Sequence, residues 1–178
     1  MPILIAAIVV VGGLCLVDLL LTFGVIRRLR VHTDMLAGAR AGRPPVTGLE
    51  TGQSPGAFSA VTTAGDLVSN MTGLRVVAFF SSSCPACPAM VPPFAEYVTS
   101  HHVGQDGVLA VVAGSPDAPP PYLAKLAEAA QVHIESAGGD VIRAFDVLAF
   151  PAFCLLDVDG AVVASAHDPS ALPVPVPA

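Results

Sequence analysis

The sequence contains few charged residues, and positive charge is scarce in most of it. Only 12% of the 178 residues are charged, and the formal net charge is −6. After Pro44 the basic residues are Arg75, Lys125 and Arg143, whereas acidic residues are frequent. Proteins that bind nucleic acid present basic surfaces to its phosphates, so this composition argues against a nucleic-acid partner.

Cysteine is also scarce, which argues against a fold held together by disulfide bonds. The chain has four cysteines, and two of them, Cys84 and Cys87, are close in sequence. Small domains that depend on disulfides have a higher density of cysteine. The four residues therefore predict no disulfide scaffold, and their number alone does not indicate the redox compartment.

Apolar residues are present in excess. They make up 53% of the chain, and the mean hydropathy is +0.71. This is too apolar for an ordinary soluble domain and too polar for a protein that lies wholly in a membrane, so one hydrophobic segment joined to one compact domain fits best. Residues 3–26 form such a segment. At about 1.5 Å per residue they can cross a hydrocarbon core of about 30 Å.

We interpret residues 1–27 as a single transmembrane anchor. A cleaved secretory signal is the alternative, but no basic residue precedes the apolar run, and the run exceeds the usual length of about 7 to 15 residues. Asp18 is the sole charged residue within the run. We expect it to lie near an interface or to contact another membrane helix.

The rest of the chain divides into three parts by composition. Residues 28–51 combine Gly, Pro, Arg and Thr without sustained periodicity, so we predict a juxtamembrane linker. Residues 52–168 carry the strand and helix patterns of a folded domain. Residues 169–178 contain four prolines, which exclude a long helix, so an irregular tail is expected there.

Strand and helix patterns alternate through the predicted domain. Continuous apolar runs, such as 75–80 and 107–113, are typical of strands buried on both faces. Segments with helical periodicity follow them. The predicted strands are 57–62, 66–68, 75–80, 107–113, 132–135, 150–156 and 161–165, and the predicted helices are 85–101, 119–131 and 140–145.

This order of elements predicts an α/β fold in which a sheet lies between two layers. The first two strands are expected to form a hairpin across Ala64–Gly65, and the last two a closing hairpin across Asp157–Gly160. Pro92 and Pro93 lie deep within the first predicted helix. Because proline lacks the backbone N–H and its ring clashes with the preceding turn, they predict a kink or a break there.

The motif Cys84-Pro85-Ala86-Cys87 lies between the predicted strand 75–80 and the helix that follows it. A helix N-terminus presents unpaired N–H groups and a partial positive charge, which favour the nucleophilic thiolate form of a cysteine placed there. Two intervening residues allow the second thiol to reach the first. A single C-x-x-C pair is nevertheless compatible with three interpretations: a redox pair, half of a metal site, or coincidence.

Together with Phe150-Pro151 at the start of the closing hairpin, the motif makes the chain resemble the thioredoxin superfamily. The likeness is greater to the membrane-anchored thioredoxin-like proteins of the TlpA and MauD type, and it covers roughly residues 52–166. It includes the added N-terminal hairpin and the run VVAFFSSSCPAC, and Pro92 stands where that family kinks its active-site helix. The resemblance implies a thioredoxin-like three-layer α/β/α sandwich, preceded here by one transmembrane helix.

The resemblance also implies roles for four residues. Cys84 would be the exposed nucleophile and Cys87 the buried resolving thiol. Pro151 would be a cis-proline, and Phe150 would pair through its backbone with the substrate chain. These roles imply a membrane-anchored thiol-disulfide oxidoreductase with no cofactor and no metal. It would act on a protein client and a redox partner, which could itself lie in the membrane.

Two residues differ from the pattern of classical thioredoxins. Ala78 replaces the buried acid six residues before the first cysteine, and Ser83 replaces the tryptophan before the motif, in a chain without tryptophan. Proton transfer to or from Cys87 therefore lacks its usual base, which argues against a general cytosolic thioredoxin. A copper- or metal-binding thioredoxin-like chaperone, since thiolates suit Cu(I), and a non-catalytic membrane scaffold are the alternative functions. Cys154 is expected to be a buried, inert thiol.

Two observations disagree on the side of the membrane that holds the domain. Arginines follow the apolar segment and none precede it, which favours a cytoplasmic domain under the positive-inside rule. The resemblance implies an extracytoplasmic domain that handles disulfides in exported proteins, and the loss of the buried acid at Ala78 also fits that group. We therefore expect a single-pass protein of the cell membrane with its domain outside the cytoplasm.

Overall fold

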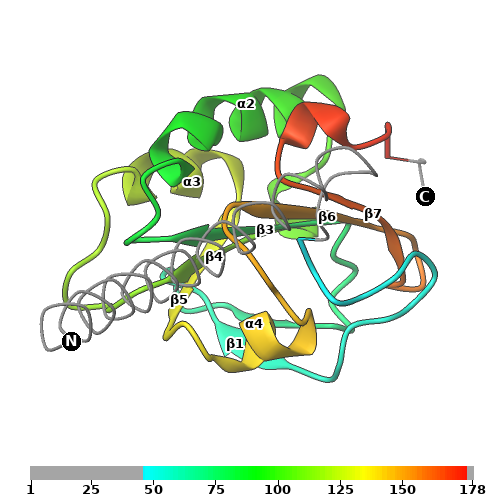
Figure 1. The fold of residues 1–178 in the computed structure, drawn as a ribbon, viewed down its shortest axis with the longest axis horizontal. Helices are drawn as coiled ribbons and strands as arrows, with labels where there is room; N and C mark the ends of the chain where they lie inside the picture. The colour runs from blue at the N-terminus through cyan, green and yellow to red at the C-terminus, as the bar shows by residue number, and fades with distance from the viewer. Residues whose placement is uncertain (1–45, 176–178) are drawn as a thin grey trace, which may run out of the picture. The chain divides into compact units, whose positions relative to one another are not determined.

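The computed structural model describes residues 46–175 (Figure 1). The chain divides into two compact units, Met1–Pro44 and Pro45–Ala178, and the described residues belong to the second. The predicted anchor, residues 1–27, and most of the predicted linker lie outside the described residues. In the part of the chain that the structure describes, no helix has the length and apolar character needed to span a membrane.

A five-stranded mixed sheet forms the centre of the domain, as predicted from the alternating pattern. Its strands lie in the order β5-β4-β3-β6-β7. The β3–β4 and β4–β5 pairs are parallel, whereas β3–β6 and β6–β7 are antiparallel. The strands are β3 (Val76–Ser81), β4 (Val108–Ala113), β5 (Gln131–Glu135), β6 (Ala152–Leu156) and β7 (Val162–Ala166).

Both faces of this sheet are covered (Figure 1). On one face lie α2 (Cys87–Ser100) and α3 (Leu123–Ala129). On the other lie α4 (Asp140–Ala144) and the hairpin of β1 (Ser59–Val61) and β2 (Leu67–Ser69), which is antiparallel as predicted. All residues of β3 and β4 are buried because side chains on both faces enter a core.

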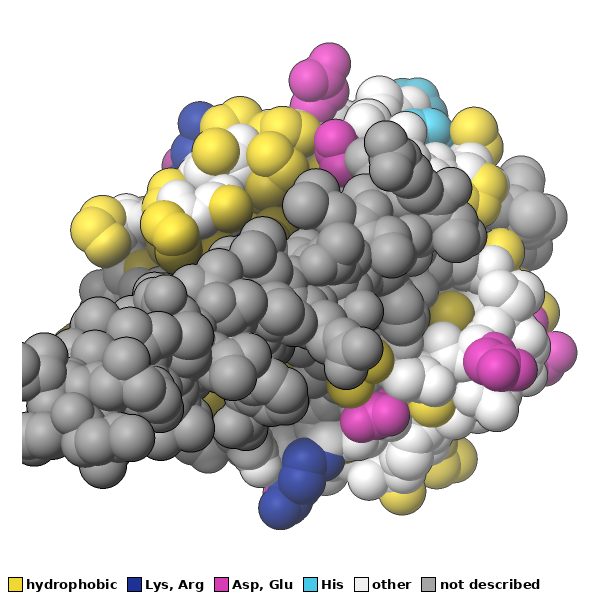
Figure 2. All heavy atoms as spheres, in the orientation of Figure 1, with side chains coloured by type: hydrophobic (Ala, Val, Ile, Leu, Met, Phe, Trp, Pro, Cys, Tyr) yellow, Lys and Arg dark blue, Asp and Glu magenta, His cyan; other side chains and the backbone are white. Residues whose placement is uncertain are grey.

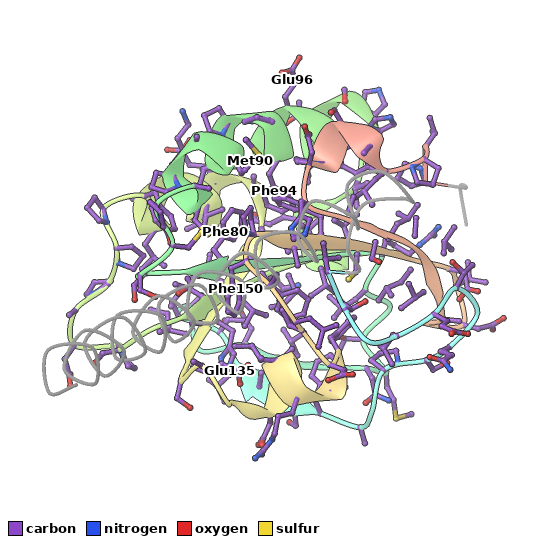
Figure 3. The ribbon with its side chains drawn as sticks, viewed as in Figure 1. Phe80, Met90, Phe94, Glu96, Glu135 and Phe150 are labelled. Atoms are coloured by element: carbon purple, nitrogen blue, oxygen red, sulfur yellow. The ribbon has the colours of Figure 1, made fainter. Side chains whose placement is uncertain are left out.

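The two cores are separated by the alternation of side chains along the strands. Phe80 of β3 points into the core under α2, whereas its neighbour Phe79 points into the core under α4. Phe80 lies edge-on to Phe94 of α2, with ring centroids 5.8 Å apart. Phe79 packs on Phe145 at 5.2 Å. Figure 3 shows Phe80, Met90 and Phe94 between α2 and the sheet.

Helix α2 continues through Pro92 and Pro93, so of the two predicted outcomes, a kink or a break, the break is wrong. The two prolines remove two of the backbone hydrogen bonds that a regular helix would have. Burial of one face of the helix, including Val91 and Phe94, holds the segment together despite this loss. Its first helical residue is Cys87, two residues later than predicted.

Helix α3 is shorter than predicted, because the prolines at 119–121 precede it instead of forming its first turn. The residue before a proline is disfavoured in the helical conformation, so consecutive prolines keep this segment extended. A backbone turn from Leu123 N to Pro120 O, 3.0 Å, then leads into the helix. A short 3₁₀ helix at Gln105–Gly107 similarly precedes β4.

The two ends of the described chain pack on the domain more closely than predicted. Val46 is buried, and its carbonyl accepts a hydrogen bond from Leu148 N at 2.9 Å. At the other end, the predicted irregular tail begins with a 3₁₀ helix at Pro169–Ala171, and Leu172 enters the core under α2. Apolar residues at the two ends account for this packing, since each buries surface that would otherwise face water.

Candidate active site

The Cys84–Cys87 motif forms a tight turn between β3 and α2. The Cys84 N–H donates to the Ser81 carbonyl at 3.1 Å, and the Cys87 N–H donates to the Cys84 carbonyl at 3.3 Å. Cys84 is half-buried and Cys87 is fully buried, and both are free thiols. The turn therefore places one sulfur at the surface and the other behind it.

The environment of Cys87 favours the protonated thiol. Its pKa is raised to about 12, first by burial and second by a hydrogen bond with the Cys84 side chain. The Ser81 N–H, 3.4 Å from the Cys87 sulfur, opposes this by donating to it and lowering the pKa. The Ser81 N–H is thus already directed at the atom that becomes negative when Cys87 ionises.

The loop before β6 forms the wall opposite Cys84. The Phe150–Pro151 peptide bond is cis, as the resemblance implies. The Cys84 thiol donates to the Phe150 carbonyl, with a sulfur–oxygen distance of 3.6 Å. The Pro151 carbonyl accepts a hydrogen bond from His167 Nδ1 at 2.8 Å, which connects this loop to the segment after β7.

Tyr122, at the start of α3, approaches the motif from the side. Its hydroxyl donates to the Ser81 carbonyl at 3.0 Å. Burial raises the pKa of Tyr122 to about 12, and the negative charges that Cys87 and Cys84 carry when ionised add to this effect. The phenol is therefore close enough to both thiols to interact with their charges, and it keeps its proton at neutral pH.

No protein-family model and no curated protein matches the chain, but solved structures do. A thio-disulfide isomerase from Thermus thermophilus aligns with a TM-score of 0.52 and 20% identity over 66% of this chain and 86% of that one. The TM-score is 0.53 for a thiol:disulfide interchange protein from Bacteroides sp., with 19% identity over 68% and 86% of the two chains.

A third solved structure is similar to this chain to the same degree. A secreted disulfide oxidoreductase from Mycobacterium tuberculosis aligns with a TM-score of 0.51 and 19% identity over 64% of this chain and 85% of that one. The described domain has a thioredoxin-like fold. The fold predicted from the Cys84–Cys87 motif and Phe150-Pro151 is thus confirmed, and the solved structures that resemble it are thiol-disulfide oxidoreductases.

The thioredoxin-like fold brings together the four residues predicted for the site. Cys84 contacts the Phe150 carbonyl directly, Pro151 follows in the cis conformation, and Cys87 lies in the core under α2. Cys154 lies elsewhere, fully buried in the core on the opposite face of the sheet. It is therefore a buried thiol, as predicted, and its place in the fold separates it from the motif.

Three polar residues of the site were missed from the sequence. Ser81 and Tyr122 contact the thiol turn, and His167 holds the Pro151 carbonyl. The sequence offered a weak signal for Tyr122, because it is one of two tyrosines in the chain and follows three consecutive prolines. Ser81 and His167 carry no pattern of their own, since Ser81 contacts the motif through its backbone groups, which any residue type could supply, and His167 contacts a carbonyl 16 residues away.

Three of the four segments that form the site carry no charged side chains, and the fourth contributes His167. Residues 76–91, 118–124 and 147–156 contain no Asp, Glu, Lys, Arg or His. Figure 2 shows hydrophobic side chains gathered on the face where α2 begins and α3 lies. Within residues 46–175, no group of three or more His, Cys, Asp or Glu is placed to hold a metal ion.

Proposed function

We propose that this protein is a thiol-disulfide oxidoreductase that exchanges disulfides with a protein client through Cys84 and Cys87. One observation carries the proposal: a half-buried thiol lies against the Phe150 carbonyl of a cis-proline loop, with a second, buried thiol three residues later. The fold, shared with known thiol-disulfide oxidoreductases, supports it.

The proposed reaction begins at Cys84, the more accessible thiol. Its thiolate attacks one sulfur of a client disulfide, forming a mixed disulfide and releasing the other client sulfur as a thiolate, which takes up a proton. Cys87 then loses its proton and attacks the Cys84 sulfur. The Cys84–Cys87 bond forms, and the bond to the client breaks. The client is reduced and the protein is oxidised, and the reverse sequence would oxidise a client dithiol.

The cis-proline loop supports recognition of an extended client segment. The Phe150 backbone lies beside the Cys84 sulfur, so a chain bound at that sulfur would run along the loop. Because the segments that carry the two cysteines, Tyr122 and the cis-proline contain no charged side chains, backbone hydrogen bonds and apolar contacts, rather than salt bridges, would hold the client there.

We further propose that residues 1–27 tether the domain to the cell membrane, as in the TlpA and MauD type. The apolar run 3–26 supports the tether. On the resemblance, the domain would face away from the cytoplasm and exchange electrons with a second redox protein at the membrane. The arginines after the apolar run favour the opposite side. Accessibility of the domain to protease in intact cells without their outer layers would decide between the two.

Reduction of insulin by dithiothreitol, followed as precipitation, tests the proposed activity. We expect the full chain to accelerate the reaction and Cys84→Ser to lose the acceleration by at least about 100-fold, because Cys87 and Cys154, the other two cysteines of residues 46–175, are buried. A protein that folds but accelerates nothing would instead be a scaffold. Equal rates for the parent and Cys84→Ser would refute Cys84 as the nucleophile.

A further inference from the structure

Ser81, the last residue of β3, connects three parts of the site. Its carbonyl accepts hydrogen bonds from the Cys84 N–H at 3.1 Å and from the Tyr122 hydroxyl at 3.0 Å. Its own N–H donates to the Cys87 sulfur at 3.4 Å. Ser81 is almost fully buried, so water does not readily replace these partners.

The position of the Tyr122 hydroxyl is fixed by the packing of its ring. The ring packs against Phe80 with centroids 6.1 Å apart, and it lies at the edge of the same core as Cys87. Phe80 directly precedes Ser81 in β3, so the ring and the hydroxyl of Tyr122 contact consecutive residues of one strand. This leaves the hydroxyl little freedom to move away from the Ser81 carbonyl.

We propose that Tyr122 is a positioning residue, which acts through Ser81 to hold the Cys87 sulfur in place for its attack on the mixed disulfide at Cys84. The inference rests on the proposed oxidoreductase function and concerns its second step. Tyr122 neither gives nor takes a proton in that step. Cys87 loses its proton, its sulfur bonds to that of Cys84, and the client leaves as a thiolate that takes up one proton, so the step is balanced.

Two observations explain why the second thiol needs such support. The strand position that carries a buried acid in classical thioredoxins is Ala78, so proton transfer at Cys87 has no carboxylate partner there. The Ser81 N–H is the backbone group that counteracts burial at Cys87. If the peptide at Ser81 shifts, this hydrogen bond weakens, and the Cys87 thiolate becomes rarer and less well aligned.

The test separates the two thiol reactions in time. Cys84 would attack dithiobis(nitrobenzoic acid), an aromatic disulfide, and release one of its halves as a coloured thiolate. Cys87 would then attack the Cys84 sulfur and release the other half, so the reduced full chain gives colour in two phases. Cys84→Ser and Cys87→Ser assign the phases. We expect Tyr122→Phe to slow the second phase by about threefold to tenfold, the effect of one hydrogen bond, and to leave the first phase within about twofold.

Tyr97→Phe is the matched control. The Tyr97 hydroxyl also donates to a backbone carbonyl, that of Pro173 at 2.7 Å, but this contact lies at the far end of α2 from the motif. Each variant loses one hydroxyl and one hydrogen bond while keeping its ring. Tyr97→Phe should leave both phases unchanged, and thermal unfolding of the two variants measures any loss of stability separately.

Selective slowing of the second phase in Tyr122→Phe supports the proposal, because a general loss of stability would not distinguish the two thiols. Unchanged phases, equal slowing of both phases, or the same slowing in Tyr97→Phe would overturn it while leaving the oxidoreductase function standing. If the parent itself shows no second phase, the proposed function fails, and the positioning role fails with it.

Discussion

The domain contains two fully buried cysteines that lie on opposite faces of the same sheet. Cys87 belongs to the core under α2, and Cys154 to the core under α4 and the β1–β2 hairpin. Neither side chain is exposed, and in both cases burial is the main cause of a pKa raised to about 12. By burial and pKa alone, the two thiols are equivalent.

Cys87 and Cys154 differ in the groups that surround them. Cys87 receives a hydrogen bond from the Ser81 N–H, and its sulfur lies behind Cys84, which is accessible. Cys154 is in the middle of β6, paired with Val77 of β3, and the other two cysteines of residues 46–175 lie on the other face. The raised pKa of each buried thiol therefore reflects its burial and does not identify a redox residue. Cys87 is proposed as a redox residue because the accessible thiol of Cys84 lies next to it.

Replacing each buried thiol in turn gives the largest contrast. Cys87→Ala should lower insulin reduction at least about 30-fold, because the mixed disulfide at Cys84 is no longer resolved within the protein. Cys154→Ala should keep the rate within about twofold and instead lower the free energy of unfolding by about 1 kcal/mol, through the small cavity it leaves. The insulin assay and urea unfolding measure the two effects.

This contrast depends on both variants being folded at the assay temperature. Circular dichroism and the unfolding curves establish that. A drop in activity of Cys154→Ala as large as that of Cys87→Ala, in a folded protein, would show that the two thiols cooperate. It would contradict the conclusion that Cys154 takes no part in the exchange.

A smaller effect is expected from a charged pair of His133 and Glu135 on the Cys154 side of the sheet. Figure 3 shows Glu135 near α4. His133 Nε2 lies 3.5 Å from Glu135, whose carboxylate also accepts the Ile142 N–H at 2.7 Å. The hydrogen bond to Glu135 raises the pKa of His133. Burial opposes ionisation of Glu135, but hydrogen bonds from His133, Ile142 and Val141 outweigh it and lower its pKa.

These directions define a pH window. The raised pKa of His133 stabilises the fold below its ordinary value of 6.5 and ceases to do so as pH rises through the folded value. The lowered pKa of Glu135 stabilises the fold above its ordinary value of 4.5, and this is lost as pH falls through the folded value. Both contributions are complete between the two ordinary values.

Glu135→Gln should therefore lower the free energy of unfolding by about 1 kcal/mol within that window, and by less at lower pH, while disulfide exchange stays unchanged. Asp140→Asn is the matched control, because Asp140 pairs with Arg143 on the exposed surface of α4. A slower exchange in Glu135→Gln would mean that the two faces of the sheet are coupled.

The sequence predicted the strands of this fold well, because its apolar runs leave few alternatives. The predicted strands 75–80 and 107–113 correspond to β3 (Val76–Ser81) and β4 (Val108–Ala113), in which every residue is buried. The helices were less predictable. The prolines suggested a kink or a break in α2, and the prolines and apolar face of 119–131 suggested a long α3. The buried face of α2 keeps it continuous, and the three prolines delay the start of α3.

At the site, the residues that belong to a local sequence motif could be predicted, whereas those brought to the site by the folding of the chain were missed. The Cys84–Cys87 spacing and Phe150-Pro151 are local in sequence, so they could be recognised. Tyr122 reaches the carbonyl of Ser81 across 41 residues, a contact that depends on how α3 packs on the sheet. No spacing rule relates a tyrosine after a proline run to the end of a strand.

The most direct test of the redox pair is to locate the disulfide formed on oxidation. The reduced full chain is equilibrated with glutathione disulfide, free thiols are alkylated after denaturation, and peptides are mapped by mass. We predict that Cys84 and Cys87 are joined to each other and protected from alkylation, while Cys154 is alkylated. Alkylation of both Cys84 and Cys87, or a disulfide that includes Cys154, would contradict it.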